Sequence, residues 1–175
     1  MTIIGVRDFQ NHLYAPLHDL TEVHLNAPLD DDYLIKEGDI LFVRSNGNPA
    51  LVGRSIIVPQ IEGPITFSGF TIRGRIHDAR ALPSFLAHFF KSRDFAEMIK
   101  TVGRGANIRN LSQGILKELE IPLPSIAMQQ AIVAEMEAEQ TLIAANRENS
   151  FGTPSKRTTP LVNTSLPFWP TTCSR

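Results

Sequence analysis

The chain has 175 residues, of which 42 % are hydrophobic and 20 % charged, and its formal net charge is −1. This composition is ordinary for a globular protein and excludes bulk disorder and a collagen-like repeat. No stretch approaches the roughly 18 consecutive apolar residues of a membrane-spanning helix. Cys173 is the only cysteine, which excludes a disulfide framework and a cysteine-based zinc site. We therefore expect one domain, with or without an appended element, in a reducing, cytoplasmic compartment and not in a membrane.

Charge is distributed unevenly along the chain. Residues 36–117 carry twelve basic and six acidic side chains, whereas residues 1–35 and residues 118–150 each carry one basic and six acidic side chains. A basic middle between acidic flanks can bind a polyanion such as nucleic acid. The alternative is a solvated face with unpaired arginines.

Runs of branched and aromatic residues predict three strands, 40–44, 51–58 and 70–76. Gly38 suits a tight turn before the first strand. The pair Asn46-Gly47 predicts a hairpin turn of the primed type between the first two strands. In the third strand Arg73 and Arg75 alternate with apolar residues, so both are expected on the face opposite the apolar one.

Apolar periodicity predicts three helices, 83–91, 94–101 and 126–148. Pro83 suits a first helical turn, and Asp94 followed by Glu97 predicts a capping box for the second helix. A short strand is expected over 119–123. The tail, 151–175, has thirteen Ser, Thr or Pro residues and no acidic one, which predicts disorder or a non-native ending.

Catalytic signatures are absent from the sequence. It has no P-loop and no dinucleotide-binding glycine motif. None of the five histidines forms a metal-binding pair, and no serine lies in a nucleophile elbow. We therefore expect a non-catalytic binding module without cofactor or metal.

Three groups of residues, taken in order, carry a family resemblance. The first is Gly-Asp-Ile-Leu-Phe-Val-Arg-Ser-Asn-Gly over 38–47, with Val-Gly-Arg at 52–54; the second is Ser-Phe-Leu from 84, continuing through Phe90 and Ser92 to Gly103. The third is Asn-Leu-Ser at 110–112, Leu-Glu-Ile-Pro-Leu-Pro at 119–124 and Gln-Gln-Ala-Ile-Val at 129–133. This series resembles the target recognition domain of type I restriction–modification specificity subunits.

The resemblance implies an α+β fold: a target-recognition-domain-like twisted β-sheet with short helices, then one long C-terminal α-helix and a disordered tail. It divides the chain into a DNA target recognition domain (1–124), a conserved spacer and dimerisation helix (125–149) and the tail (150–175). Ser125 and Met128 stand where the family often has Pro and Glu. Because a full subunit usually has two such domains and two helices, we expect either a half-subunit that pairs with another copy or a truncated product.

The function implied is to read one half-site of double-stranded DNA and bring it to the methyltransferase subunit and, through it, to the nuclease subunit. Such a subunit performs no bond chemistry. Two alternatives stay open. The chain is the recognition fragment of a fused methyltransferase–nuclease, or it is a truncated interaction module that binds the methyltransferase without reading DNA.

Phosphate contacts call for Arg and Lys, and base reading calls for Arg, Asn or Gln. The predicted DNA-binding residues are Arg44, Asn46, Asn48, Arg54, Arg73, Arg75, Lys100, Arg104, Asn107, Arg109, Gln113 and Lys117. Three alternatives accompany them: the asparagines at 46 and 48 only form the turn, the arginines at 73 and 75 form a solvated face, and the arginine at 44 pairs with Asp39 or an acidic loop residue.

The long helix has an apolar stripe beside a strip of alanines. Small residues allow close helix approach, so antiparallel pairing with a second recognition domain is expected. The predicted partner-helix interface comprises Met128, Ile132, Ala134, Met136, Ala138 and Leu142. The alternative is that the stripe packs only on its own domain. Gln129 is expected to cap or orient the helix.

Overall fold

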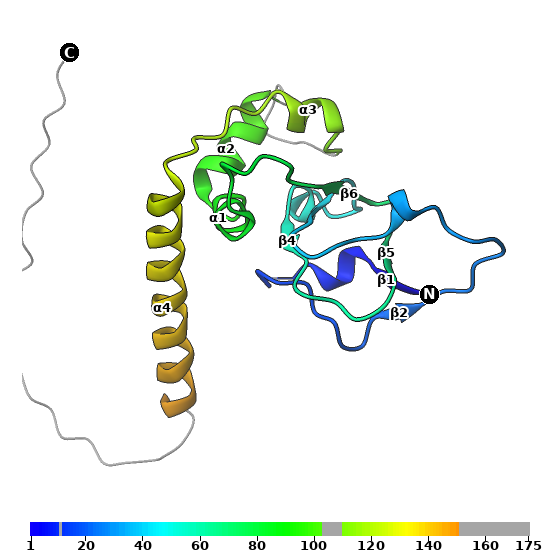
Figure 1. Ribbon diagram of the computed structural model, residues 1–175, viewed down its shortest axis with the longest axis horizontal. Helices are drawn as coiled ribbons and strands as arrows, with labels where there is room; N and C mark the ends of the chain where they lie inside the picture. Colours follow the sequence, from blue (N-terminus) through cyan, green and yellow to red (C-terminus); the bar gives the residue numbers. More distant parts are fainter. Residues whose placement is uncertain (11, 103–109, 151–175) are drawn as a thin grey trace, which may run out of the picture. The chain divides into compact units, whose positions relative to one another are not determined.

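The structure, a computed structural model, describes residues 1–10, 12–102 and 110–150. Its elements, in chain order, are β1 (Thr2–Ile4), the 3-10 helix η1 (Val6–Asp8), β2 (Thr21–Glu22), η2 (Asp31–Tyr33), β3 (Ile40–Val43), η3 (Pro49–Leu51), β4 (Ser55–Ile57), β5 (Ile65–Phe67), β6 (Thr71–Gly74), α1 (Pro83–Phe89), α2 (Arg93–Val102), α3 (Gln113–Lys117) and α4 (Ile126–Ser150) (Figure 1). Met1–Ala138 forms one compact unit, and the described residues 139–150 belong to a second. The first unit therefore includes the beginning of α4.

The first unit contains two small three-stranded sheets. One has the order β4-β3-β6 and is antiparallel throughout, with Phe42 opposite Ser55 on one side and Ile72 on the other. The second has the order β2-β1-β5, in which β1 pairs antiparallel to β2 and parallel to β5. The α+β class is confirmed, but the single expected sheet is divided in two.

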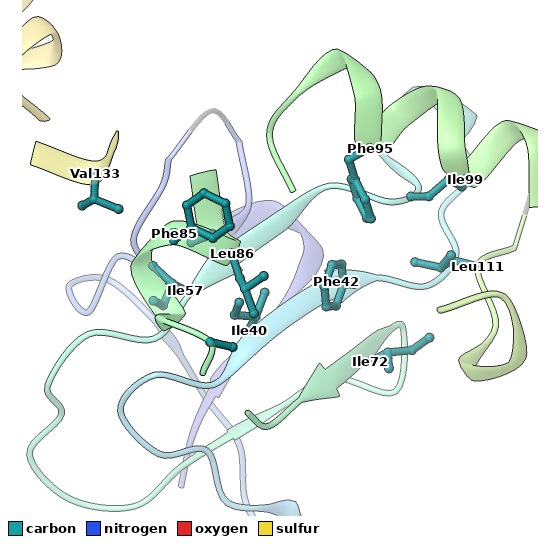
Figure 2. Close-up of a cluster of buried hydrophobic side chains, with 12 residues drawn as sticks. Ile40, Phe42, Ile57, Ile72, Phe85, Leu86, Phe95, Ile99, Leu111 and Val133 are labelled. Atoms are coloured by element: carbon teal, nitrogen blue, oxygen red, sulfur yellow. The ribbon is translucent and has the colours of Figure 1, made fainter. Parts of the chain in front are cut away.

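Strand β3 is buried along its whole length, as its continuous apolar run requires. Because successive side chains point to opposite faces, Ile40 and Phe42 enter one hydrophobic cluster while Leu41 and Val43 enter another. The first cluster receives α1 and α2 (Figure 2), where the Phe42 and Phe95 rings lie 6.1 Å apart between centroids. The sheet is thus covered on both faces.

The predicted primed turn after β3 is wrong. The φ angle of Gly47 lies outside the positive range that such a turn needs. The connection instead contains η3, whose first turn is capped by Asn48 Oδ1, which accepts a hydrogen bond from Ala50 N at 3.0 Å. Gly53 then supplies the left-handed residue, with φ of +84°, and the returning strand begins only at Ser55.

Helix ends are fixed by side-chain caps, with one correction. Pro83 is the first residue of α1, as predicted. The N-terminus of α2 is capped by Ser92, whose Oγ accepts from Phe95 N at 3.2 Å, so the predicted Asp94–Glu97 capping box is wrong; Glu97 pairs with Lys100 instead. The capping residue is the one directly before the first turn of a helix. That residue is Ser92, because the helix begins one residue earlier than expected.

One further prediction needs correction, and two elements were not predicted. Residues 119–123 form no strand, because no other described segment pairs with them. Strand β5 and helix α3 were not expected from the sequence. The long helix is confirmed as α4, and Ser125 begins it by accepting hydrogen bonds through its carbonyl from Gln129 N and through its Oγ from Met128 N. The predicted disordered tail lies outside the described residues from 151 onward.

Candidate nucleic-acid interface

The C-terminal end of β3 is where several loops meet. Val43 N donates to Arg54 O at 2.8 Å, and Gly53 N donates to Val43 O at 3.0 Å. One residue further, Arg44 N donates to Phe70 O at 2.8 Å, while Arg44 O accepts from Leu111 N at 2.7 Å. Segments 44–54, 68–70 and 110–113 are therefore held against one another by backbone hydrogen bonds. We call this region the β3 end.

An open groove of about 550 Å³ lies between the start of β4 and helix α2. Three cations line it: Arg54, Lys91 and Lys100. None of the groove-lining residues is acidic. The apolar floor includes Phe95 and Ile99 of α2, both of which belong to the hydrophobic core. We call this feature the basic groove.

Among the residues that the structure describes, two of the three cations in the basic groove have only neutral partners. The Arg54 guanidinium donates to Gln10 O at 3.0 Å and to Ala50 O at 3.4 Å, and Lys91 Nζ donates to His12 O at 2.6 Å. Burial lowers the pKa of Lys91, and the charge of Arg54 lowers that pKa further. Two like charges held close together without a carboxylate favour a bound anion.

The remaining described candidates near the β3 end are exposed or take part in turns. Arg44, Gln113 and Lys117 are exposed. Asn46 Oδ1 accepts from Asn48 N at 2.8 Å, and the side chain of Asn48 caps η3. The turn-forming role of both asparagines is thus confirmed, and base reading by either one stays a prediction. Lys100 is bound to Glu97 at 2.8 Å.

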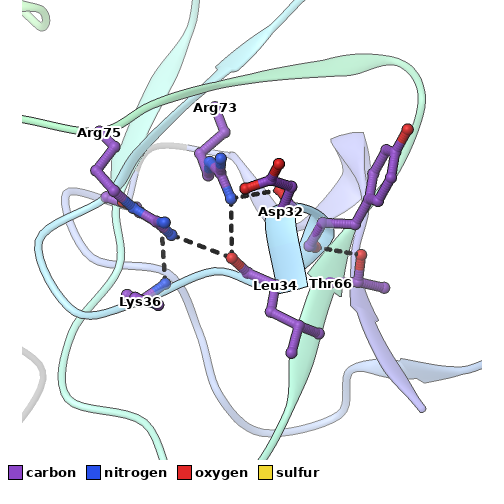
Figure 3. A network of polar contacts seen from close by, with 8 residues as sticks. Asp32, Leu34, Lys36, Thr66, Arg73 and Arg75 are labelled. Atoms are coloured by element: carbon purple, nitrogen blue, oxygen red, sulfur yellow. Dashed lines mark hydrogen bonds and ion pairs between the residues drawn. The ribbon is translucent and has the colours of Figure 1, made fainter. Parts of the chain in front are cut away.

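Arg73 and Arg75 hold the fold together rather than forming a solvated face. Both guanidinium groups donate to the carbonyl of Leu34, and Arg73 also reaches Asp32 O (Figure 3). Arg75 binds both carboxylate oxygens of Asp39, at 2.8 and 2.7 Å, and the Asp39 side chain is only 1 % exposed. The alternative pairing of Arg44 with this aspartate is therefore wrong.

The physical reason is that the second face of β6 is also covered. Thr71, which precedes the two arginines on that strand, is 5 % exposed. Alternation in the sequence cannot show whether the polar face of a strand meets water or a loop, and here it meets residues 32–39. DNA contact by Arg73 or Arg75 stays a prediction. The hydrogen bonds and the ion pair that these arginines make within the chain do not favour it.

Arg104, Asn107 and Arg109 lie outside the described residues; they belong to the segment that joins α2 to the β3 end. Two residues of interest were missed by the sequence reasoning, Lys91 and Phe70. Lys91 lies between Phe90 and Ser92, which also line the groove, and its Nζ donates to the carbonyl of residue 12; no motif in the sequence singled it out. The strand expected over 70–76 would place Phe70 on its apolar face, opposite the two arginines, but Phe70 is 63 % exposed at the turn before β6.

Helix α4 begins with a buried polar anchor. Gln129 is fully buried; its Oε1 accepts from Leu82 N at 2.8 Å, and its Nε2 donates to Arg80 O at 2.8 Å and to Pro124 O at 2.7 Å. The side chain connects the first turn of α4 to the start of α1, so the predicted orienting role is borne out by this geometry. The sequence feature that predicted this role was a glutamine at the start of an apolar helix.

Only some residues of the predicted partner-helix interface are exposed. Ile132 packs against the core cluster beside Val133, and Met136 is half-buried. Met128 is 55 % exposed, and Ala134 and Ala138 are exposed as well. In the second unit, Leu142 is 65 % exposed. Helix pairing stays a prediction, and it rests on the exposed residues of the predicted interface.

The described ranges contain no cluster of three or more His, Cys, Asp or Glu side chains arranged to hold a metal ion. Within the same ranges, no helix has the length and apolar character needed to cross a membrane.

Comparison with known proteins places the chain in context. The family model for the type I restriction modification DNA specificity domain matches residues 3–149. The type I restriction enzyme StySPI specificity subunit of Salmonella potsdam is 28 % identical over 145 residues, and the EcoKI specificity subunit of Escherichia coli (strain K12) is 30 % identical over 145 residues. Each match covers 82 % of this chain but 30 % of the relative. The chain therefore spans under a third of the length of these curated relatives.

Solved structures have the same fold. The HsdS subunit from Thermoanaerobacter tengcongensis superposes with a TM-score of 0.62 at 23 % identity, covering 84 % of this chain and 37 % of that chain. A chain from a structure concerned with complex assembly and conformational transition of the type I R-M system gives a TM-score of 0.60 at 18 % identity, covering 85 % and 33 %. Because the family model covers most of the sequence, this chain belongs to the type I restriction modification DNA specificity domain family.

Proposed function

We propose that this chain is a non-catalytic module that binds double-stranded DNA and reads one half-site for a type I restriction–modification complex. The observation that carries the proposal is the basic groove, where Arg54 and Lys91 lie together without a carboxylate among the lining residues. A DNA phosphate placed there would remove the mutual repulsion of the two cations. A cytoplasmic location fits this ligand.

Base reading would fall to the β3 end, next to the basic groove. Arg44 and Gln113 are exposed there on backbone segments that hydrogen bonds hold in place. Phosphate contacts orient a protein on the duplex, and side chains at base edges supply specificity. The groove and the β3 end together provide both kinds of group within one unit.

The salt dependence of DNA binding tests this proposal. The full chain is titrated into a fluorescent duplex at several salt concentrations, and the slope of log affinity against log salt is measured. Each phosphate contact contributes about 0.9 to that slope. The double variant Arg54→Gln/Lys91→Gln should lower the slope by roughly twice that amount.

The matched control is Lys36→Gln, which removes an exposed lysine outside the groove lining. It should leave the slope within error of the wild-type value. Equal slopes for the control and the double variant would contradict a phosphate site in the groove. Absence of any DNA binding at low salt would favour the truncated interaction module.

A second candidate function is docking of a partner, favoured by the exposed apolar and small residues of α4. Met128 is 55 % exposed, and it shares the first part of the helix with exposed Ala134 and Ala138. We propose that this surface pairs with a second recognition domain, in another copy or a longer subunit, and that the helix docks the methyltransferase, which in turn recruits the nuclease. Ala134→Glu/Ala138→Glu should abolish self-association in light scattering, and an unchanged oligomer would refute the pairing.

A further inference from the structure

Phe70 is an aromatic residue that the fold leaves in solvent. It is 63 % exposed and lies in the turn that joins β5 to β6. This turn is fixed by Thr71, whose backbone N and Oγ1 both donate to Ser68 O, at 3.0 and 2.6 Å. The ring is therefore presented on a rigid turn, and neither hydrophobic cluster includes it.

The sheet register places a basic residue opposite Phe70. Val43 pairs with Thr71 in the antiparallel ladder, so Arg44 stands opposite Phe70, and the hydrogen bond from Arg44 N to Phe70 O continues the ladder. Residues directly opposite one another in an antiparallel pair project from the same face. Arg44 is exposed, and its side chain has no carboxylate partner among the described residues.

The same backbone contact brings a polar segment to the pair. Leu111 N donates to Arg44 O, and Gln113 follows as the exposed first residue of α3. An exposed ring, a cation and an amide thus occur together at the β3 end. Duplex DNA presents matching chemistry, since it offers phosphates, base-edge hydrogen-bonding groups and the apolar surfaces of bases.

We propose that Phe70 is a specificity-determining residue that makes an apolar contact with a base of duplex DNA, with Arg44 binding beside it. The inference rests on the proposed DNA-binding function and adds to it a contact that the charged and amide side chains cannot make. Aromatic and aliphatic side chains contact the thymine methyl group in the major groove or wedge between base steps. A ring held on a rigid turn loses little conformational freedom on binding.

The test uses the full chain and two duplexes. One is the duplex that the wild-type chain enriches from a randomised library, and the other is a scrambled duplex of the same composition. Phe70→Ala should lower the ratio of the two affinities about tenfold, the scale of one lost base contact. It should leave the affinity for the scrambled duplex and the salt slope unchanged, because no charge is removed.

Two further variants separate this role from a structural one. Arg44→Gln should lower the salt slope by about 0.9. Tyr33→Ala removes another aromatic side chain, 56 % exposed on η2, and should leave the affinity ratio unchanged. Far-UV circular dichroism melts of all variants should coincide with the wild type, since none of the three side chains lies in the core.

The outcomes distinguish the inference from the function on which it rests. If the wild-type chain binds neither duplex, the DNA-binding function fails and the inference fails with it. If the wild type selects a duplex and Phe70→Ala keeps the same selectivity, the inference is overturned while the function stands. Unchanged DNA selectivity with weakened capture of the methyltransferase would identify Phe70 as a protein contact and overturn it too.

Discussion

Replacement of Gln129 by methionine tests how the start of α4 is fixed to the rest of the first unit. The Gln129 side chain is fully buried and makes three hydrogen bonds of 2.7 to 2.8 Å, with Leu82 N, Arg80 O and Pro124 O. Methionine has a similar volume, so the cavity term is small. The variant instead leaves one backbone N–H group and two carbonyl groups without their partner.

The expected cost follows from these three groups. A net hydrogen bond contributes about 1 kcal/mol, and a buried group left unsatisfied costs about 1 to 3 kcal/mol. Leu82 and Pro124, which carry two of the three groups, are half-buried. We expect Gln129→Met to lower the free energy of unfolding by about 3 kcal/mol.

Urea denaturation followed by far-UV circular dichroism measures this quantity. The matched control is Gln130→Met, because Gln130 is the next residue of the same helix and is exposed. That variant should change the free energy of unfolding by less than about 0.5 kcal/mol. Equal midpoints for the two variants would refute the view that the buried amide fixes the start of α4.

Three further predictions concern stability and are measured by the same denaturation assay. Arg75→Leu leaves the buried Asp39 carboxylate without its ion-pair partner and should cost about 3 kcal/mol; a loss below about 1 kcal/mol would contradict an important role for the pair. Burial lowers the pKa of His88, so the unfolded chain binds a proton first as pH falls below about 6.5 and stability decreases there; His88→Gln should flatten this decrease, and an equal pH dependence in both proteins would count against it. Gly53→Ala should cost about 1 to 2 kcal/mol because φ is +84° and the new Cβ would lie 3.2 Å from a side-chain methyl of α2, whereas Gly47→Ala, which meets nothing within 4 Å, should be nearly neutral.

Local features of the fold could be predicted because their causes are local. A run of four apolar residues at 40–43 predicts a buried strand, and Gly38 before it adopts the φ of +81° that a tight turn needs. Pro83 begins α1 as its fixed φ favours. The order of short motifs along the chain indicated the family, which the family match over residues 3–149 confirms.

The candidate site was less predictable, because side chains acquire partners from distant parts of the chain. Arg73 and Arg75 have the pattern of a solvated face, yet residues 32–39 cover them. Lys91 belongs to no sequence motif; the structure places it in the basic groove with Arg54, and its Nζ donates to the carbonyl of residue 12, which is 79 positions away.

The residue pattern alone was thus enough to indicate the α+β class, the long helix α4, the family and the basic character of the middle of the chain. Folding in three dimensions sets which cations have internal partners, which aromatic residues stay in solvent and where the groove lies. The physical reason is the distance along the chain over which each interaction acts. Backbone preference, capping and apolar periodicity act within a few residues, whereas ion pairing and burial depend on which loop packs against which sheet face.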